Sequence, residues 1–87
     1  MAENRTIAAG RREYGYTVVF EPLPEGGFNV FVPALPEICT YGETMEEARA
    51  MARDAIQCYL ESALETGEHI PGDVKELLTE RVEVTIP

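Results

Sequence analysis

Few side chains in this sequence have the type and spacing that catalysis or metal binding requires. His69 is the sole histidine, and the two cysteines, Cys39 and Cys58, are separated by 18 residues. A structural zinc site takes closely spaced cysteine and histidine ligands, and neither cysteine has such a neighbour. We therefore expect no metal and no cofactor, two reduced thiols packed as small buried hydrophobes, and an exposed, non-catalytic loop position for His69.

Acidic residues are numerous, but their predicted positions on the strands and helix do not suit nuclease chemistry. Hydrolysis with two Mg²⁺ ions requires several carboxylates that converge on metals about 3.5–4 Å apart. The first predicted strand offers only Glu21, at its end, while Glu47 is better explained by helix capping and Asp54 falls on the polar face of the predicted helix. We predict that the protein is not an enzyme.

The distribution of charge favours a protein partner. The formal net charge is −9, and residues 14–87 hold 14 acidic and four basic side chains. Such a surface repels nucleic acid phosphates and attracts a basic protein, although acidity that merely keeps a small protein soluble stays open as an explanation. No apolar run approaches the roughly 20 residues of a membrane span, and residues 1–13 lack the apolar centre of a signal peptide. We expect a cytoplasmic protein.

A hairpin and a short third strand are the first elements that the sequence predicts. Apolar residues alternate with others over residues 16–21 and again over residues 28–32, which is the period of a strand. Between these runs lie residues typical of a turn, namely Pro22, Pro24, Gly26 and Gly27. Residues 38–41 are predicted to form the third strand.

The stretch from residue 33 to residue 42 predicts a rigid joint. Pro33 and Pro36 lack the backbone N–H that the interior of a sheet requires, so the second strand must end before them or run along an edge. Leu35, between these prolines, is expected to fill the core. Gly42 is expected to permit the turn out of the third strand.

A long helix is predicted from Thr44 onward. The Thr44 hydroxyl is placed to accept from the Glu47 N–H, and the Glu47 carboxylate to accept in return from the Thr44 N–H. From Ala48, apolar and small residues recur at three- and four-residue spacing, and Gly67 is expected to end a helix of about 22 residues.

These elements predict an α+β fold with the order β-β-β-α-β. Residues 81–87 form the last predicted strand, which is expected to lie parallel to the first after a right-handed crossover. The result is a four-stranded sheet with one long helix on one face, formed by residues 14–87 and preceded by a flexible arm, residues 1–13. The face without a helix is partly apolar, which predicts a homo-oligomer, a dimer or a tetramer, that buries Thr17, Val19, Asn29 and Phe31.

The stretch PALPEICTYGETMEEA over residues 33–48, followed by an alanine-rich helix and ETGEHIP, resembles the HicB-like antitoxin domain. The hairpin sequence YTVVFEPLPEGGFNVFVP resembles the same family, and the resemblance covers residues 14–71. It implies a truncated ribonuclease-H-like fold, in agreement with the order of elements above. The sequence ends at Pro87 without the helix-turn-helix or ribbon-helix-helix module that many members carry, so we expect a stand-alone form in which DNA binding is unlikely.

The resemblance also implies a function by binding rather than by catalysis. Members of the family bind and mask a small, basic, mRNA-cleaving toxin of the HicA type in a type II toxin-antitoxin system. The alternative from the residues alone is an orphan oligomeric domain, structural or regulatory, with another protein or a small ligand as its partner.

Two sets of residues follow from this interpretation. Acidic side chains on loops and strand ends, together with one aromatic ring, are the candidate contacts to a basic partner: Glu21, Glu25, Glu37, Tyr41 and Glu43. Glu37 stands where the family often has glycine. The residues expected to shape the joint and the start of the helix are Pro33, Leu35, Pro36, Gly42, Thr44, Glu47 and Ala48.

Overall fold

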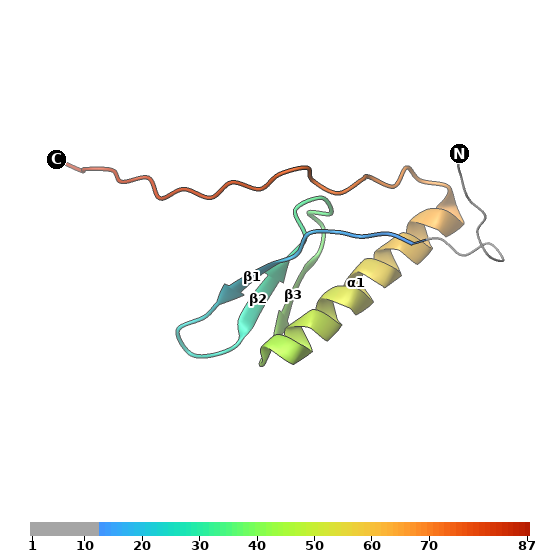
Figure 1. The fold of residues 1–87 in the computed structure, drawn as a ribbon, viewed down its shortest axis with the longest axis horizontal. Coiled ribbons are helices and arrows are strands. Elements are labelled where there is room, and N and C mark those ends of the chain that lie inside the picture. The colour runs from blue at the N-terminus through green and yellow to red at the C-terminus, as the bar shows by residue number, and fades with distance from the viewer. Residues whose placement is uncertain (1–12) are drawn as a thin grey trace.

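The computed structural model describes residues 13–87, so nearly all of the predicted arm lies outside the described residues. Three strands, β1 (Val19–Pro22), β2 (Phe28–Phe31) and β3 (Cys39–Gly42), precede one long helix, α1 (Met45–Thr66). The strands form an antiparallel sheet in the order β1-β2-β3, and α1 lies alongside it (Figure 1). The predicted α+β class with a single long helix is confirmed for this part of the chain.

The predicted hairpin is confirmed, with a shorter first strand. The Leu23 N–H donates to the Gly27 carbonyl at 3.0 Å, and the Gly26 N–H donates to the Leu23 carbonyl at 2.9 Å. Gly26 and Gly27 have φ values of 104° and 86°, which only glycine adopts without strain. Strand β1 begins at Val19 because its partner β2 ends at Phe31, shortly before Pro33 interrupts the ladder.

The joint between β2 and β3 is a pair of tight turns around a buried leucine. The Leu35 N–H donates to the Val32 carbonyl at 2.8 Å, and the Ile38 N–H donates to the Leu35 carbonyl at 2.9 Å. Leu35 is fully buried in a cluster with Val32 and Ile38, against which Tyr16 and α1 pack. Leu35 therefore fills the core as the sequence predicts.

Helix α1 has the 22 residues that the sequence predicts, from a capped start to a glycine end. Thr44 Oγ1 accepts from the Glu47 N–H at 3.0 Å. The Glu47 carboxylate accepts from the Glu43 N–H at 2.5 Å, so the predicted return bond to Thr44 is wrong by one residue. The amide of Glu43, the residue before the N-cap Thr44, is therefore the one that reaches the Glu47 carboxylate in the first turn. Gly67 ends the helix in the left-handed region at φ 76°.

The close packing of β3 against α1, rather than the predicted turn, explains why residue 42 is a glycine. The backbone of Gly42 does not have the positive φ that requires glycine, but a Cβ built there would lie 2.4 Å from the Ala48 nitrogen. Ala48 is fully buried and forms a core cluster with Val30 and Ala52. Two small residues thus allow the first turn of α1 to approach the sheet.

The predicted fourth strand is not part of this sheet. Residues 81–87 have no strand pairing in the described chain, and Val82, Val84 and Ile86 are 75%, 78% and 81% exposed. The ribonuclease-H-like assignment, which requires this strand, is therefore not shown. The expectation of buried cysteines is wrong, since Cys39 and Cys58 are both free and exposed.

A substitution at Gly42 tests the close contact with α1. We expect Gly42→Ala to lower the free energy of unfolding by about 1–3 kcal/mol, because the added methyl group meets the Ala48 backbone rather than a flexible side chain. Urea denaturation followed by circular dichroism measures the change. Gly15→Ala is the matched control, with nothing within 4 Å of the added carbon. Equal stability of the two variants would contradict the contact.

Candidate protein interface

One face of the sheet has no helix packed on it. Phe20, Phe28 and Val30 pack toward α1, so the residues that alternate with them lie on the opposite face. Strand pairing arranges these residues in two rows across the sheet. We call this surface the open face, and it comprises Val19, Phe31 and Cys39 in one row and Glu21, Asn29 and Tyr41 in the other.

Two aromatic side chains give the open face an apolar centre. Phe31 is 37% exposed and Tyr41 is 42% exposed, and each belongs to a different row. The Tyr41 ring lies against the hairpin, since a Cβ at Gly27 would lie 2.1 Å from its hydroxyl oxygen. Beside this ring, Asn29 Nδ2 donates to Glu21 Oε1 at 3.1 Å. The Tyr41 ring is therefore held in position before any partner binds.

Acidic side chains gather at one end of the open face. Pro22, Phe28 and Gly42 are neighbours across the three strands, so the hairpin loop and the start of α1 lie at the same end of the sheet. This arrangement brings together four exposed carboxylates, which we call the acidic rim: Glu21, Glu25, Glu43 and Glu46. Glu46, in the first turn of α1, was not among the partner contacts predicted from the sequence.

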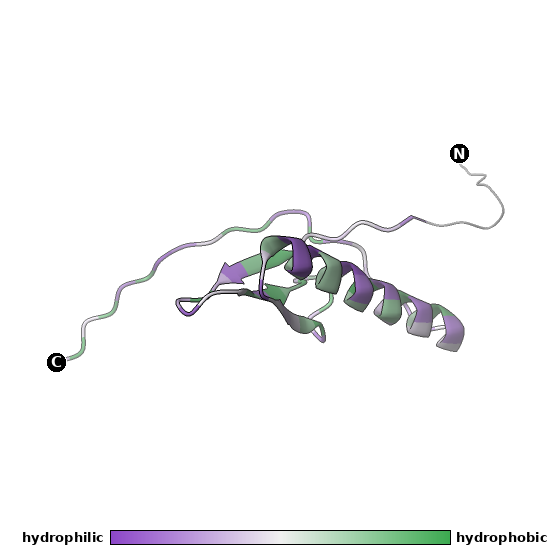
Figure 2. Cartoon of the chain, turned by 90° about the horizontal axis from the view of Figure 1, so that it is seen from below, coloured by the Kyte–Doolittle hydropathy of each residue, from purple (hydrophilic) through white to green (hydrophobic). Residues whose placement is uncertain are grey.

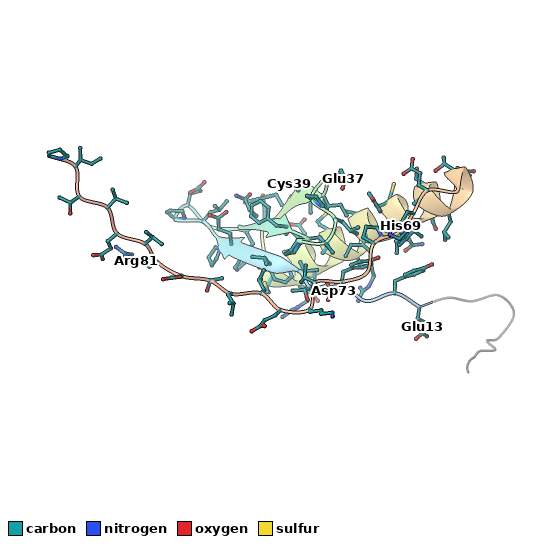
Figure 3. The ribbon with its side chains drawn as sticks, turned by 90° about the horizontal axis from the view of Figure 1, so that it is seen from above. Glu13, Glu37, Cys39, His69, Asp73 and Arg81 are labelled. Atoms are coloured by element: carbon teal, nitrogen blue, oxygen red, sulfur yellow. The ribbon has the colours of Figure 1, made fainter. Side chains whose placement is uncertain are left out.

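The structure separates Glu37 from the other predicted partner contacts. Phe31 pairs with Cys39, so the joint that carries Glu37 lies at the end of the sheet opposite the acidic rim. Figure 3 shows Glu37 beside Cys39 at that end. The predicted set of five thus divides into Glu21, Glu25, Tyr41 and Glu43 on one side and Glu37 on the other.

Thr17, predicted to lie on an oligomer face, is already bonded to a later part of its own chain. The Thr17 N–H and hydroxyl donate to the two carboxylate oxygens of Asp73 at 2.9 and 2.8 Å. The Tyr16 hydroxyl donates to the Pro71 carbonyl at 2.5 Å. These bonds tie residues 71–73 to the residues that lead into β1. Val19, Asn29 and Phe31 stay on the open face, and their role in self-association stays a prediction.

Hydrogen bonding shifts the pKa of Asp73, and burial shifts that of Tyr16. The bonds from the Thr17 amide and hydroxyl lower the pKa of Asp73 below its ordinary value, because they stabilise the carboxylate. Removal from water raises the pKa of Tyr16, and the nearby Tyr14, Tyr59 and Asp73 add to the rise. Both groups are therefore in the form that makes their bonds at neutral pH.

The remaining reactive residues do not assemble into a site. Within residues 13–87, the structure contains no group of three or more histidine, cysteine or acidic side chains able to hold a metal ion. His69 is exposed, following the end of α1. No helix in this range is both long and apolar enough to cross a bilayer.

Comparison with known proteins gives a consistent family. The family described as HicB_like antitoxin of bacterial toxin-antitoxin system matches residues 16–87. A protein of Photorhabdus laumondii named antitoxin HicB 1 is 46% identical over 56 residues, which are 64% of this chain and 36% of that protein. Antitoxin HicB of Escherichia coli K12 is 41% identical over 56 residues, or 64% of this chain and 41% of its own length.

A third relative has a length closer to that of this chain. A UPF0150 protein of Thermoplasma acidophilum is 41% identical over 64 residues, covering 74% of this chain and 93% of that protein. The chain thus spans well under half of the two proteins named as antitoxins and matches nearly all of a shorter one. None of these names favours the alternative of an orphan structural domain.

The bonds between Thr17 and Asp73 predict an acid-sensitive attachment. Because the pKa of Asp73 is lowered on folding, the attachment contributes fully above the ordinary aspartate pKa of 3.8 and is lost as the pH falls through the lower folded value. We expect the Thr17 amide resonance to shift, and its hydrogen exchange to lose protection, in that acid range. In Asp73→Asn, the same resonance should lack this transition. A wild-type Thr17 amide that is insensitive to acid would contradict the attachment.

Proposed function

The chain belongs to the HicB-like antitoxin family, and from that premise we propose that it binds and masks a small, basic, mRNA-cleaving toxin of the HicA type. The observation that supports this proposal is the open face, where a preformed aromatic centre borders the acidic rim. The protein would act by occupying the toxin surface, and none of its own residues is assigned a catalytic role.

Charge supports a basic partner. A protein that binds and cleaves RNA must present positive charge to the phosphate backbone. The acidic rim offers four exposed carboxylates at one end of the open face, in a chain with a net charge of −9. Such a surface speeds the encounter with a basic protein and competes with RNA for the same cationic groups.

The aromatic centre supplies binding affinity that charge alone does not provide. Exposed ion pairs contribute only about 0–1 kcal/mol each, whereas buried aromatic anchors dominate many protein interfaces. Tyr41 is held against Gly27, so little of its side-chain freedom is lost when a partner covers it, and Phe31 on the adjacent strand adds apolar area beside it. We therefore assign affinity mainly to Phe31 and Tyr41, and association rate mainly to the acidic rim.

Binding to a small, basic, mRNA-cleaving toxin of the HicA type tests this proposal. We expect the purified proteins to form a complex on a sizing column and the toxin in that complex to lose its cleavage of RNA. Absence of any complex would refute the proposed function.

Variants of the acidic rim test the assigned face. We expect Glu21→Lys combined with Glu43→Lys to lower the association rate constant by more than about tenfold at low salt, because a steering charge is reversed at two positions. Glu37→Lys, an exposed glutamate at the other end of the sheet, is the control and should have a much smaller effect. Stopped-flow or surface plasmon resonance measures the rates, and equal effects of these variants would contradict the face.

Tyr41→Ala tests the aromatic centre separately. We expect this variant to raise the dissociation rate constant by more than about tenfold with little change in the association rate, as for other truncated anchors. Tyr14→Ala is the matched control, since Tyr14 is similarly exposed at 41% but lies outside the open face. A weaker effect of Tyr41→Ala than of Tyr14→Ala would place the anchor elsewhere.

A further inference from the structure

An apolar groove lies between β1 and α1, on the face of the sheet that carries the helix. Helix α1 packs mainly on β2 and β3, so the flank of β1 is left uncovered in the described chain. The groove is lined by Val18 just before β1, by Phe20 on β1, and by Ala52, Ile56 and Leu60 on α1. We call it the β1 groove.

Strand β1 is also an edge of the sheet. In the order β1-β2-β3, its second side has no strand partner among residues 13–87. The backbone N–H and carbonyl groups along such an edge are able to accept an added strand. The edge and the β1 groove adjoin, so one added strand would satisfy the backbone and cover the apolar side chains together.

Residues 81–87 have the pattern of a strand but no sheet to join. Val82, Val84 and Ile86 alternate with Arg81, Glu83 and Thr85, which is the period of a half-buried strand. The three apolar side chains are at least 75% exposed. Figure 2 shows this segment extending away from the rest of the molecule. The edge of β1 thus lacks a neighbouring strand, and residues 81–87 lack a sheet to join.

The attachment at Asp73 directs residues 81–87 beyond their own β1. Asp73 is bonded to Thr17, and the chain then runs in the direction of β1 past the hairpin (Figures 1 and 3). From Thr17 to Pro22 the chain advances about 17 Å, whereas the eight residues from Asp73 to Arg81 advance about 26 Å when extended. Arg81 therefore lies beyond the end of β1, the edge strand that its segment runs alongside.

The segment that does lie level with β1 is a poor strand. Residues 74–78 carry their apolar side chains at Val74, Leu77 and Leu78, which do not alternate.

The extended path also gives the chain a Cα radius of gyration of 16.7 Å, against about 12 Å for a compact chain of this length. A second copy of the chain is the nearest source of a matching edge.

We propose that residues 81–87 of one copy add as a fourth strand to β1 of a second copy, with Val82, Val84 and Ile86 in its β1 groove. A two-fold axis makes the exchange reciprocal, so each copy both gives and receives a strand.

Light scattering on the full chain tests the exchange first. We expect a dimer at micromolar concentration whose dissociation constant rises by more than about tenfold in Val84→Asp, because a charged carboxylate would replace an apolar side chain and lose its hydration on burial. Thr85→Asp introduces the same charge on the opposite side of the strand and should leave the dimer nearly unchanged. A monomeric wild-type protein, or a dimer indifferent to Val84→Asp, would overturn the proposal.

A disulfide distinguishes exchange between copies from closure within one copy. In a Cys39→Ser, Cys58→Ser background, Val19→Cys on β1 and Thr85→Cys on the added strand lie on the same side of the extended sheet. Oxidation should give a covalent dimer on a non-reducing gel, while Thr85→Cys alone should remain a single chain. A double variant that cross-links within one chain would show closure on its own β1 and overturn the exchange.

Discussion

A single helix that packs tightly over β2 and β3 is the constraint on which the rest of this structure depends. The approach is possible because Gly42 and Ala48 present almost no side-chain bulk where β3 meets the first turn of α1. The same approach commits α1 to one side of the sheet and to two of its three strands. The open face and the β1 groove are therefore both consequences of how closely the helix packs.

Local chemistry explains why much of the fold could be predicted from the sequence. Thr44 and Gly67 define the ends of α1 through bonds made within a few residues, and the glycines of the hairpin define its turn in the same way. Leu35 between two prolines is likewise a local signal, because the neighbouring backbone has few other conformations. Where the deciding contact was distant, the prediction was weaker: the need for Gly42 arises from Ala48 across the joint, not from a turn.

The predicted fourth strand shows why a correct local sequence pattern does not determine where an element lies in the fold. Residues 81–87 alternate as a strand should, but a strand requires a partner edge, and the attachment of Asp73 to Thr17 carries the segment away from the edge of β1. The candidate site was limited in the same way. Residue type selected the acidic and aromatic side chains, whereas the strand pairing, which brings Glu43 to the hairpin end and leaves Glu37 at the other, required the structure.

The two uncovered surfaces differ in chemistry, and this difference is why we propose a different partner for each. The β1 groove is mainly apolar and adjoins a backbone edge, so it suits an extended segment with alternating apolar residues, which this chain itself carries. The open face has a small aromatic centre beside the acidic rim, so its charge suits a basic protein better than a second copy of this acidic chain. Strand exchange through the groove would leave two open faces available, one on each copy. Self-association and toxin binding would then not compete, because each uses a surface that the other leaves exposed.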